Sequence, residues 1–167
     1  MTTTSPFCPC GSGLVYDTCC RPLHQGEREA ESAEALMRSR YAAFALGGLG
    51  DYLLATWHDD APAKAGLDAA ALSRRELDWR RLEVLAVDEQ GARATVEFRA
   101  TFSPPAPLGA KAVEESLHER SRFVREEGRW RYLDGEIFDP ARAVKQGRNA
   151  PCLCGSGRKY KHCCAQR

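Results

Sequence analysis

The position of the cysteines constrains this chain more than any other feature of its sequence. All eight lie near the two ends of the 167 residues, and none falls within residues 21–151. Each end carries a Cys-x-Cys unit, eight intervening residues and an adjacent Cys-Cys pair, and residues 8–20 match residues 152–164 at eight of thirteen positions. This is an internal repeat. The two sets are Cys8, Cys10, Cys19 and Cys20, and Cys152, Cys154, Cys163 and Cys164.

Metal ligation explains this spacing better than a disulfide framework. A chain of this length can bury a core without crosslinks, and a cytosolic protein keeps its thiols reduced. Gly11 and Gly13 permit the sharp turn that would bring each Cys-x-Cys unit around one ion. Four thiolates in a tetrahedral shell are typical of a closed structural zinc site, although iron is also compatible with such a shell. We therefore expect two zinc ions, with iron as the alternative metal. His162 is expected at the surface, and its use as a ligand is the less favoured alternative.

Composition narrows the class of protein. The formal net charge is +1 and 43% of the residues are apolar, which predicts a folded domain and argues against a dedicated nucleic-acid binder. No segment has the run of apolar residues that a membrane span needs, and the start of the chain does not resemble a secretion signal. The sequence therefore predicts a cytoplasmic protein without a membrane partner.

The two cysteine copies differ in charge. The first contains Leu14, Val15 and Tyr16, which we expect to pack against the middle of the chain as a structural clip. The second is basic and follows a polar segment, so it is predicted to dock on an acidic protein surface. The alternative is that its charges only offset the thiolates, and direct binding of nucleic acid is a weaker third reading. The expected docking residues are Arg158, Lys159, Tyr160 and Lys161.

The residues between the copies show a helical period first and a period of two afterwards. Ser32, Asp51 and Asp68 are expected to cap three helices that end near Leu46, Trp57 and Leu72. Alternating apolar and polar residues then predict a hairpin over 82–102 and two further strands over 117–124 and 130–134. Helices followed by an antiparallel sheet predict an α+β fold.

These motifs carry a family resemblance that covers nearly the whole chain. The string Cys152-Leu-Cys-Gly-Ser-Gly-Arg-Lys-Tyr-Lys-His-Cys-Cys164 resembles the SEC-C motif at the C-terminus of the SecA translocation ATPase. The segments Leu36–Tyr41, Thr56–His58, Glu119–Phe123 and Trp130–Gly135 resemble the bacterial YchJ family.

The resemblance implies an architecture and a direction for function. It implies a cone-shaped, cystatin-like middle domain of the nuclear transport factor two type, with helices packed on a curved antiparallel sheet. Metal knuckles over 1–26 and 145–167 would flank this domain over 27–144. In SecA the motif implies docking to a chaperone and to ribosomes. The leading hypothesis is therefore a metal-binding adaptor whose C-terminal knuckle binds a protein or ribosomal partner.

A cofactor-free enzyme or a small-ligand binder is the alternative function, because cone-shaped folds enclose a pocket between helices and sheet. The face formed by His118, Arg120 and Arg122 is either solvated or lines a cationic pocket for an anionic ligand. No serine has the surroundings of a catalytic nucleophile, so no catalytic residue is assigned. The candidate pocket residues are Arg38, Arg40, Tyr41, Trp57, His58, His118, Arg120, Arg122 and Asp134.

Overall fold

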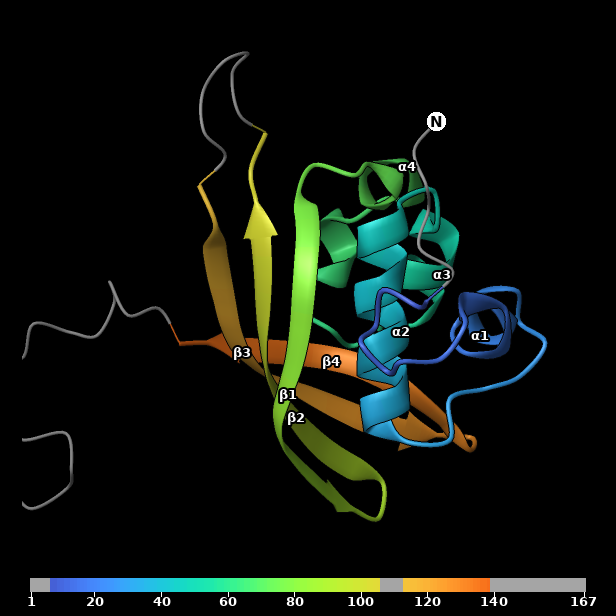
Figure 1. Ribbon diagram of the computed structural model, residues 1–167. Coiled ribbons are helices and arrows are strands. Elements are labelled where there is room, and N and C mark those ends of the chain that lie inside the picture. Colours follow the sequence, from blue (N-terminus) through green and yellow to red (C-terminus); the bar gives the residue numbers. More distant parts are fainter. Residues whose placement is uncertain (1–6, 106–112, 139–167) are drawn as a thin grey trace, which may run out of the picture. The chain divides into compact units, whose positions relative to one another are not determined.

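The computed structural model describes residues 7–105 and 113–138, and their elements follow the predicted order of helices and then strands (Figure 1). The second cysteine set and the docking candidates Arg158–Lys161 lie outside these described residues. All of the elements below belong to one unit, residues 1–137.

The helices are short except for one. Ser32 accepts a hydrogen bond from the backbone N–H of Ala35 and so caps the long helix as predicted, and Asp68 does the same for Ala71. Asp51 is not a cap: its helix begins one residue earlier, and Asp51 lies in the first turn. The helices are α1 (Arg21–His24), α2 (Ala33–Leu46), α3 (Gly50–Ala55) and α4 (Ala69–Ser73), with 3-10 turns η1 (Tyr16–Thr18) and η2 (Lys64–Gly66).

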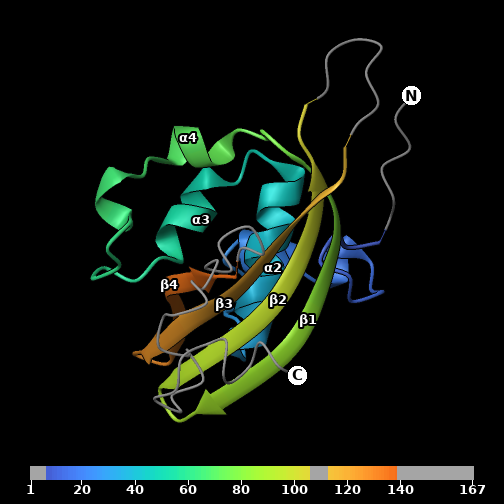
Figure 2. The ribbon, with the colours of Figure 1, turned by 90° about the vertical axis from the view of Figure 1, so that its left-hand side faces the viewer.

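Four antiparallel strands form the sheet in the order β1-β2-β3-β4. The strands bend around α2, which packs against their concave face (Figures 1 and 2). Register shifts in β1, and between β3 and β4, insert extra residues, and bulges of this kind increase strand bending. The strands are β1 (Asp78–Gln90), β2 (Arg93–Ser103), β3 (Glu115–Glu126) and β4 (Arg129–Ile137).

The core lies between α2 and the concave face. The period of two in β2 buries Ala94, Val96, Phe98 and Ala100 on one face, as the alternation predicted. Phe123 on β3 is 1% exposed and packs in the same cluster. The chain is therefore an α+β fold with helices on one side of an antiparallel sheet.

The segment after α3 extends the sheet beyond β4. Trp57 forms a bridge with Tyr132, the N–H of His58 donates to the carbonyl of Tyr132, and the N–H of Tyr132 donates to the carbonyl of Thr56. This pairing fixes Trp57 at the edge of the concave face. Within residues 7–105 and 113–138, no helix has the length and apolar character needed to cross a membrane.

Candidate functional site

The first cysteine copy folds into a tight knuckle. Phe7 pairs with Val15, and the N–H of Cys8 donates to the carbonyl of Leu14 at 2.7 Å, which closes the loop between them. Gly11 and Gly13 have φ of 76° and 77°, the left-handed conformation that glycine adopts without strain. Cys20 lies immediately before α1, so the adjacent pair occupies the predicted turn at a helix start.

The four sulfur atoms converge on one point. Cys8, Cys10, Cys19 and Cys20 place their Sγ atoms within 4.8 Å of one another. The Sγ of Cys19 is 3.6 Å from that of Cys10 and 3.8 Å from that of Cys20. Zinc–sulfur bonds of about 2.3 Å in a tetrahedron require sulfur separations of about 3.8 Å, whereas a disulfide requires about 2 Å. The residues therefore fit a metal ion and are free thiols.

Crowding of the thiols shifts their acidities in opposite directions. Hydrogen bonds from Cys20 and then Cys8 stabilise the Cys10 thiolate and hold its pKa far below the usual value. The same contact with Cys10 raises the pKa of Cys20 far above it, and a side-chain contact with Cys10 raises the pKa of Cys8 to about 12. One thiolate therefore forms readily while further ionisation is opposed. A cation would allow all four to ionise.

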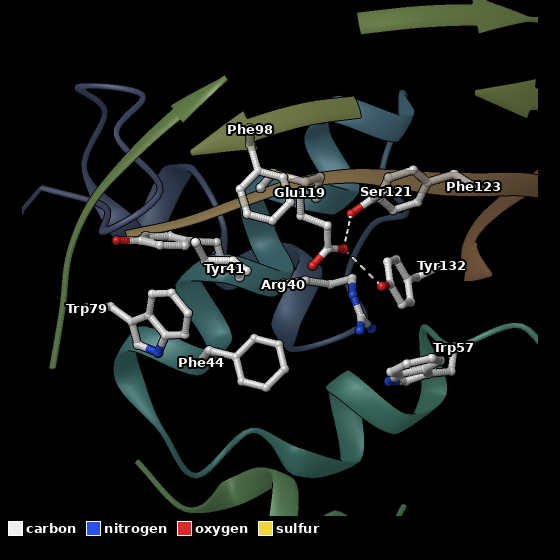
Figure 3. Close-up of a pocket in the computed structure, with 12 residues that line it drawn as sticks. Arg40, Tyr41, Phe44, Trp57, Trp79, Phe98, Glu119, Ser121, Phe123 and Tyr132 are labelled. Carbon is white, nitrogen blue, oxygen red and sulfur yellow. Dashed lines mark hydrogen bonds between the residues drawn. The ribbon is translucent and has the colours of Figure 1, made fainter. Parts of the chain in front are cut away.

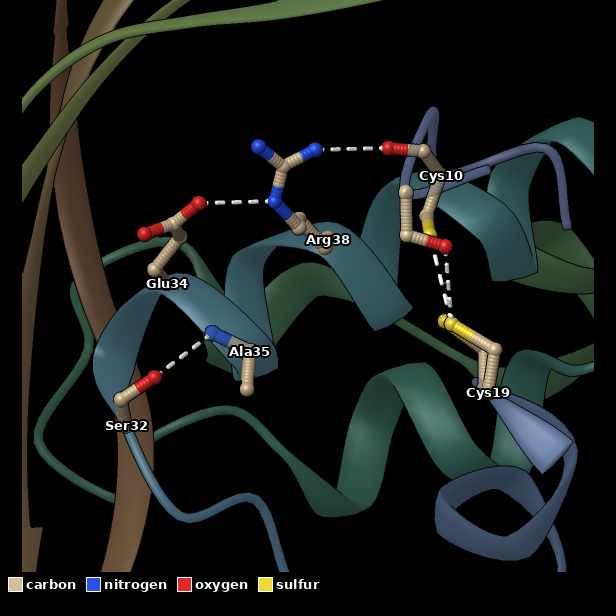
Figure 4. Close-up of polar contacts among 8 residues, drawn as sticks. Cys10, Cys19, Ser32, Glu34, Ala35 and Arg38 are labelled. Carbon is tan, nitrogen blue, oxygen red and sulfur yellow. Dashed lines mark hydrogen bonds and ion pairs between the residues drawn. The ribbon is translucent and has the colours of Figure 1, made fainter. Parts of the chain in front are cut away.

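Polar contacts attach the knuckle to α2. Arg38 donates from Nη1 to the carbonyl of Cys10 at 2.9 Å, while its Nε contacts Glu34 (Figure 4). His24 lies 2.8 Å from both the Ser39 carbonyl and the Tyr16 hydroxyl, so Nε2 donates to the carbonyl and Nδ1 accepts from the hydroxyl. Burial lowers the pKa of His24, which favours this neutral form.

The apolar contact that accompanies these hydrogen bonds between the knuckle and α2 is small. Ala42 of α2 is fully buried beside Cys8, Cys10 and Cys20. The expected packing of Leu14 and Val15 against the middle domain is wrong, because their residues are 56% and 44% exposed. The first knuckle is instead attached to α2 by hydrogen bonds between the side chains of Arg38 and His24 and backbone carbonyl groups.

A cavity of about 260 Å³ lies on the opposite side of α2, between this helix and the concave face of the sheet. Aromatic rings from α2, from all four strands and from the segment after α3 line most of it, and a few polar groups gather at one end (Figure 3). The cavity walls are formed by Met37, Arg40, Tyr41, Phe44, Trp57, Trp79, Phe98, Leu117, Glu119, Ser121, Phe123 and Tyr132.

Arg40 is the buried cation of this cavity, with 6% exposure. Its Nη1 donates to the carbonyl of Leu53 and the hydroxyl of Thr56, at 2.9 and 2.5 Å. Its guanidinium carbon lies 5.2 Å from the ring centre of Trp57 and 4.7 Å from that of Tyr132. Burial lowers the pKa of Arg40 to about 10, so the side chain remains charged at neutral pH.

Glu119 provides the carboxylate of the same cavity. Its Oε1 accepts from the hydroxyls of Ser121 and Tyr132, at 2.7 and 3.0 Å. Burial, with the negative charge of Glu119, raises the pKa of Tyr132 and keeps that hydroxyl protonated. Gly135 makes room for this arrangement, because a Cβ there would lie 2.1 Å from Oε1.

The candidate pocket residues do not all lie in one place. Tyr41 and Trp57 line the cavity together with Arg40. Arg38 faces the knuckle instead. His58 is buried beside the cavity wall, where Nε2 contacts Glu126 and Nδ1 accepts from the N–H of Asp60.

Of the two readings of the basic face of β3, the structure supports the solvated one, and the candidates His118, Arg120, Arg122 and Asp134 do not line the cavity. Arg120 and His118 contact Glu97 at 2.7 and 2.9 Å, on the face of the sheet opposite the cavity. Arg122 is 63% exposed and makes a bidentate contact with Asp134 at 2.5 Å. The alternation of β3 places these side chains outward, while the intervening residues, Glu119 and Ser121, line the cavity.

Comparisons with known proteins agree with this architecture. The family model described as "YchJ, middle NTF2-like domain" matches residues 32–135, and the SEC-C motif matches residues 8–22 and 148–166. A UPF0225 protein of Sodalis glossinidius is 44% identical over 161 residues, covering 95% of this chain and 97% of the relative. One from Serratia proteamaculans is 41% identical, covering 96% and 98%.

Two solved structures are also similar. A SEC-C motif-containing protein from Rhodopseudomonas palustris has 43% identity and a TM-score of 0.67, with 79% of this chain and 98% of that chain covered. A SEC-C motif-containing protein from Psychrobacter arcticus has 32% identity and a TM-score of 0.61, with 95% of each covered. The fold is therefore shared with SEC-C motif-containing proteins from two bacteria.

Proposed function

The chain belongs to the YchJ family, and from that premise we propose that it is a cytoplasmic zinc-binding adaptor. The convergence of four sulfur atoms within 4.8 Å is the observation that carries this proposal. Zinc fits the tetrahedral thiolate shell without requiring redox chemistry, and four protein ligands leave no open position for a substrate. The metal would therefore hold structure, with Cys8, Cys10, Cys19 and Cys20 as its ligands.

In this proposal the first knuckle is a clip. Its contacts with Ser39, Arg38 and Ala42 attach it to α2, so a metal ion in the knuckle would stabilise the start of the chain against the middle domain. A second zinc ion would occupy Cys152, Cys154, Cys163 and Cys164, which repeat the spacing of the first set.

The second knuckle would be the docking element. Between its cysteine pairs it carries Arg158, Lys159 and Lys161 beside Tyr160, where the first knuckle has Leu14, Val15 and Asp17 beside Tyr16. Basic residues around one aromatic ring suit an acidic protein surface, since charge complementarity steers association and the ring supplies buried area. A chaperone or a ribosomal protein is the proposed class of partner.

The test is affinity capture from bacterial lysate with the full-length chain and a Lys159→Glu/Lys161→Glu variant. We expect the variant to keep its metal and lose the captured partner. An Arg74→Glu/Arg80→Glu variant is the control, because both arginines are exposed and lie outside the knuckles. Equal capture by the intact chain and the lysine variant would contradict docking through the second knuckle.

A further inference from the structure

The cavity holds a buried cation that forms no salt bridge within the described residues. Arg40 donates both of its hydrogen bonds within the described residues from Nη1, so Nε and Nη2 remain available. Glu119 lines the same cavity, and its negative charge partly offsets the lowering of the Arg40 pKa by burial, but the two side chains form no salt bridge. Burying a guanidinium is costly unless its donors find acceptors, and its two ring contacts satisfy none of them.

A second unused donor lies beside Arg40. The indole Nε1 of Trp57 is buried and has no hydrogen-bond partner within the described part of the chain. Leaving such a buried donor unpaired is unfavourable, so an orphaned group of this kind needs an explanation. Trp57 packs edge-on against Tyr132 at 4.6 Å, which holds the indole at the cavity wall.

The available acceptor lies on the opposite strand. Both hydrogen bonds that Glu119 accepts among the described residues end on Oε1, which leaves Oε2 for another donor. Figure 3 shows the carboxylate and the Arg40 guanidinium at the same end of the cavity. This end therefore offers donors and an acceptor at once, and its two charges cancel.

The rest of the wall is apolar and aromatic. Phe44 and Trp79 lie away from the charged end (Figure 3), and Phe98 and Leu117 add further apolar wall. A cavity of about 150 Å³ lined by apolar side chains holds benzene. The larger volume here, about 260 Å³, suits one aromatic ring with a short polar arm.

We propose that this cavity binds a neutral aromatic ligand whose head group is a carboxamide or a similar donor–acceptor pair. The carbonyl oxygen of the ligand accepts from Arg40 and Trp57, and its N–H donates to Oε2 of Glu119. A carboxylate head would meet the negative charge of Glu119, and an ammonium head would meet Arg40. This binding site shares no residue with the first knuckle and goes beyond the adaptor function.

An isosteric pair of probes tests the proposal on the full-length chain. We would titrate 3-phenylpropanamide and 3-phenylpropionate while following the three tryptophan indole N–H signals by NMR. The amide should bind at least about tenfold more tightly than the carboxylate, because the carboxylate removes the donor that Glu119 requires. The signals of Trp57 and Trp79 should shift, while Trp130 should not, since it does not line the cavity.

Two variants assign the head-group contacts. Glu119→Gln replaces the acceptor with an amide, so the carboxylate probe should gain about tenfold and the preference should reverse. Trp57→Phe removes an orphaned donor, so it should weaken amide binding several-fold without a matching loss of thermal stability. Arg122→Gln is the control, because Arg122 is exposed on the opposite face.

Failure of the wild-type chain to bind the amide at millimolar concentration would overturn the proposal. Tighter binding of the carboxylate than of the amide would overturn the assignment of a neutral head group. Because the cavity walls include none of the cysteines or proposed docking residues, either result would leave the adaptor proposal standing on its own test.

Discussion

The knuckle and the cavity lie on opposite sides of α2 and are stabilised by different means. Arg38, Ser39 and Ala42 face the knuckle, whereas Arg40 and Tyr41 face the core and cavity. A helix of 3.6 residues per turn separates these two sets onto opposite faces. One helix therefore supports two sites that have no residue in common.

The difference lies in how much apolar surface each region buries. The middle domain has a continuous core of leucine, valine and aromatic side chains between α2 and the sheet. At the knuckle, the buried cluster consists of three cysteines and Ala42 of α2, with Tyr16 and Cys19 partly buried against it. Under the proposed function, a region with so little apolar burial depends on a bound metal and on hydrogen bonds, while the middle domain folds by burial. The predictions below test this separation.

Metal removal should give the largest effect. Metal ligation supplies about 10–16 kcal/mol of apparent binding free energy in small zinc peptides, so a chelator should unfold the knuckle. Hydrogen exchange would report rapid loss of protection at Cys8 and Gly11, with Val96 and Ala100 still protected in β2. Simultaneous loss of protection in both regions would show that they are one cooperative unit.

A second change perturbs the middle domain and leaves the knuckle intact, by removing a large buried side chain. Phe123→Ala should lower its free energy of unfolding by about 3–5 kcal/mol, because Phe123 is almost completely buried. Denaturant unfolding followed by tryptophan fluorescence would measure this loss. Metal content should be unchanged under native conditions, and Val124→Ala on the outward side of β3 should cost much less. Loss of the metal in natively folded Phe123→Ala would contradict the separation.

Acid should weaken the attachment of the knuckle to α2 by a smaller amount. The pKa of His24 is lowered by burial, so the unfolded chain takes up the proton first as pH falls below about 6.5. The contribution of neutral His24 to the free energy of unfolding is therefore complete above this pH. It is lost as the pH falls through the lower pKa of the folded state, at no more than about 1.4 kcal/mol per pH unit.

Comparison of the wild-type chain with His24→Gln isolates the contribution of His24 to stability. Denaturation at several pH values between 5 and 8 should show a stability difference that shrinks in acid, because protonation of the thiolates affects both chains equally. A difference that is constant with pH would mean that His24 does not act as a neutral donor to Ser39.

Much of the fold could be predicted because its signals are local. The cap at Ser32, the left-handed glycines at positions 11 and 13 and the alternation along β2 each depend on neighbouring residues. Asp51 was assigned wrongly as a cap because the start of α3 is set one residue earlier, where Gly50 packs closely against α4.

The cavity could be predicted only in part. Tyr41 and Trp57 were identified, but Glu119 was overlooked, although it alternates with Leu117 and Phe123 on the inward face of β3. The basic residues that alternate with them were the pocket candidates instead, and they lie on the outward face. Which face is inward depends on the bend of the whole sheet around α2, and this long-range feature is not encoded in the charges of one strand (Figure 2).

Metal content of the purified full-length chain is the most direct test of the metal clip. Elemental analysis combined with native mass spectrometry would count the ions in the wild-type chain and in Cys10→Ser. The proposal predicts two zinc ions per wild-type chain and one in the variant, with all thiols reduced. A wild-type chain without metal, or with disulfides between these cysteines, would contradict it.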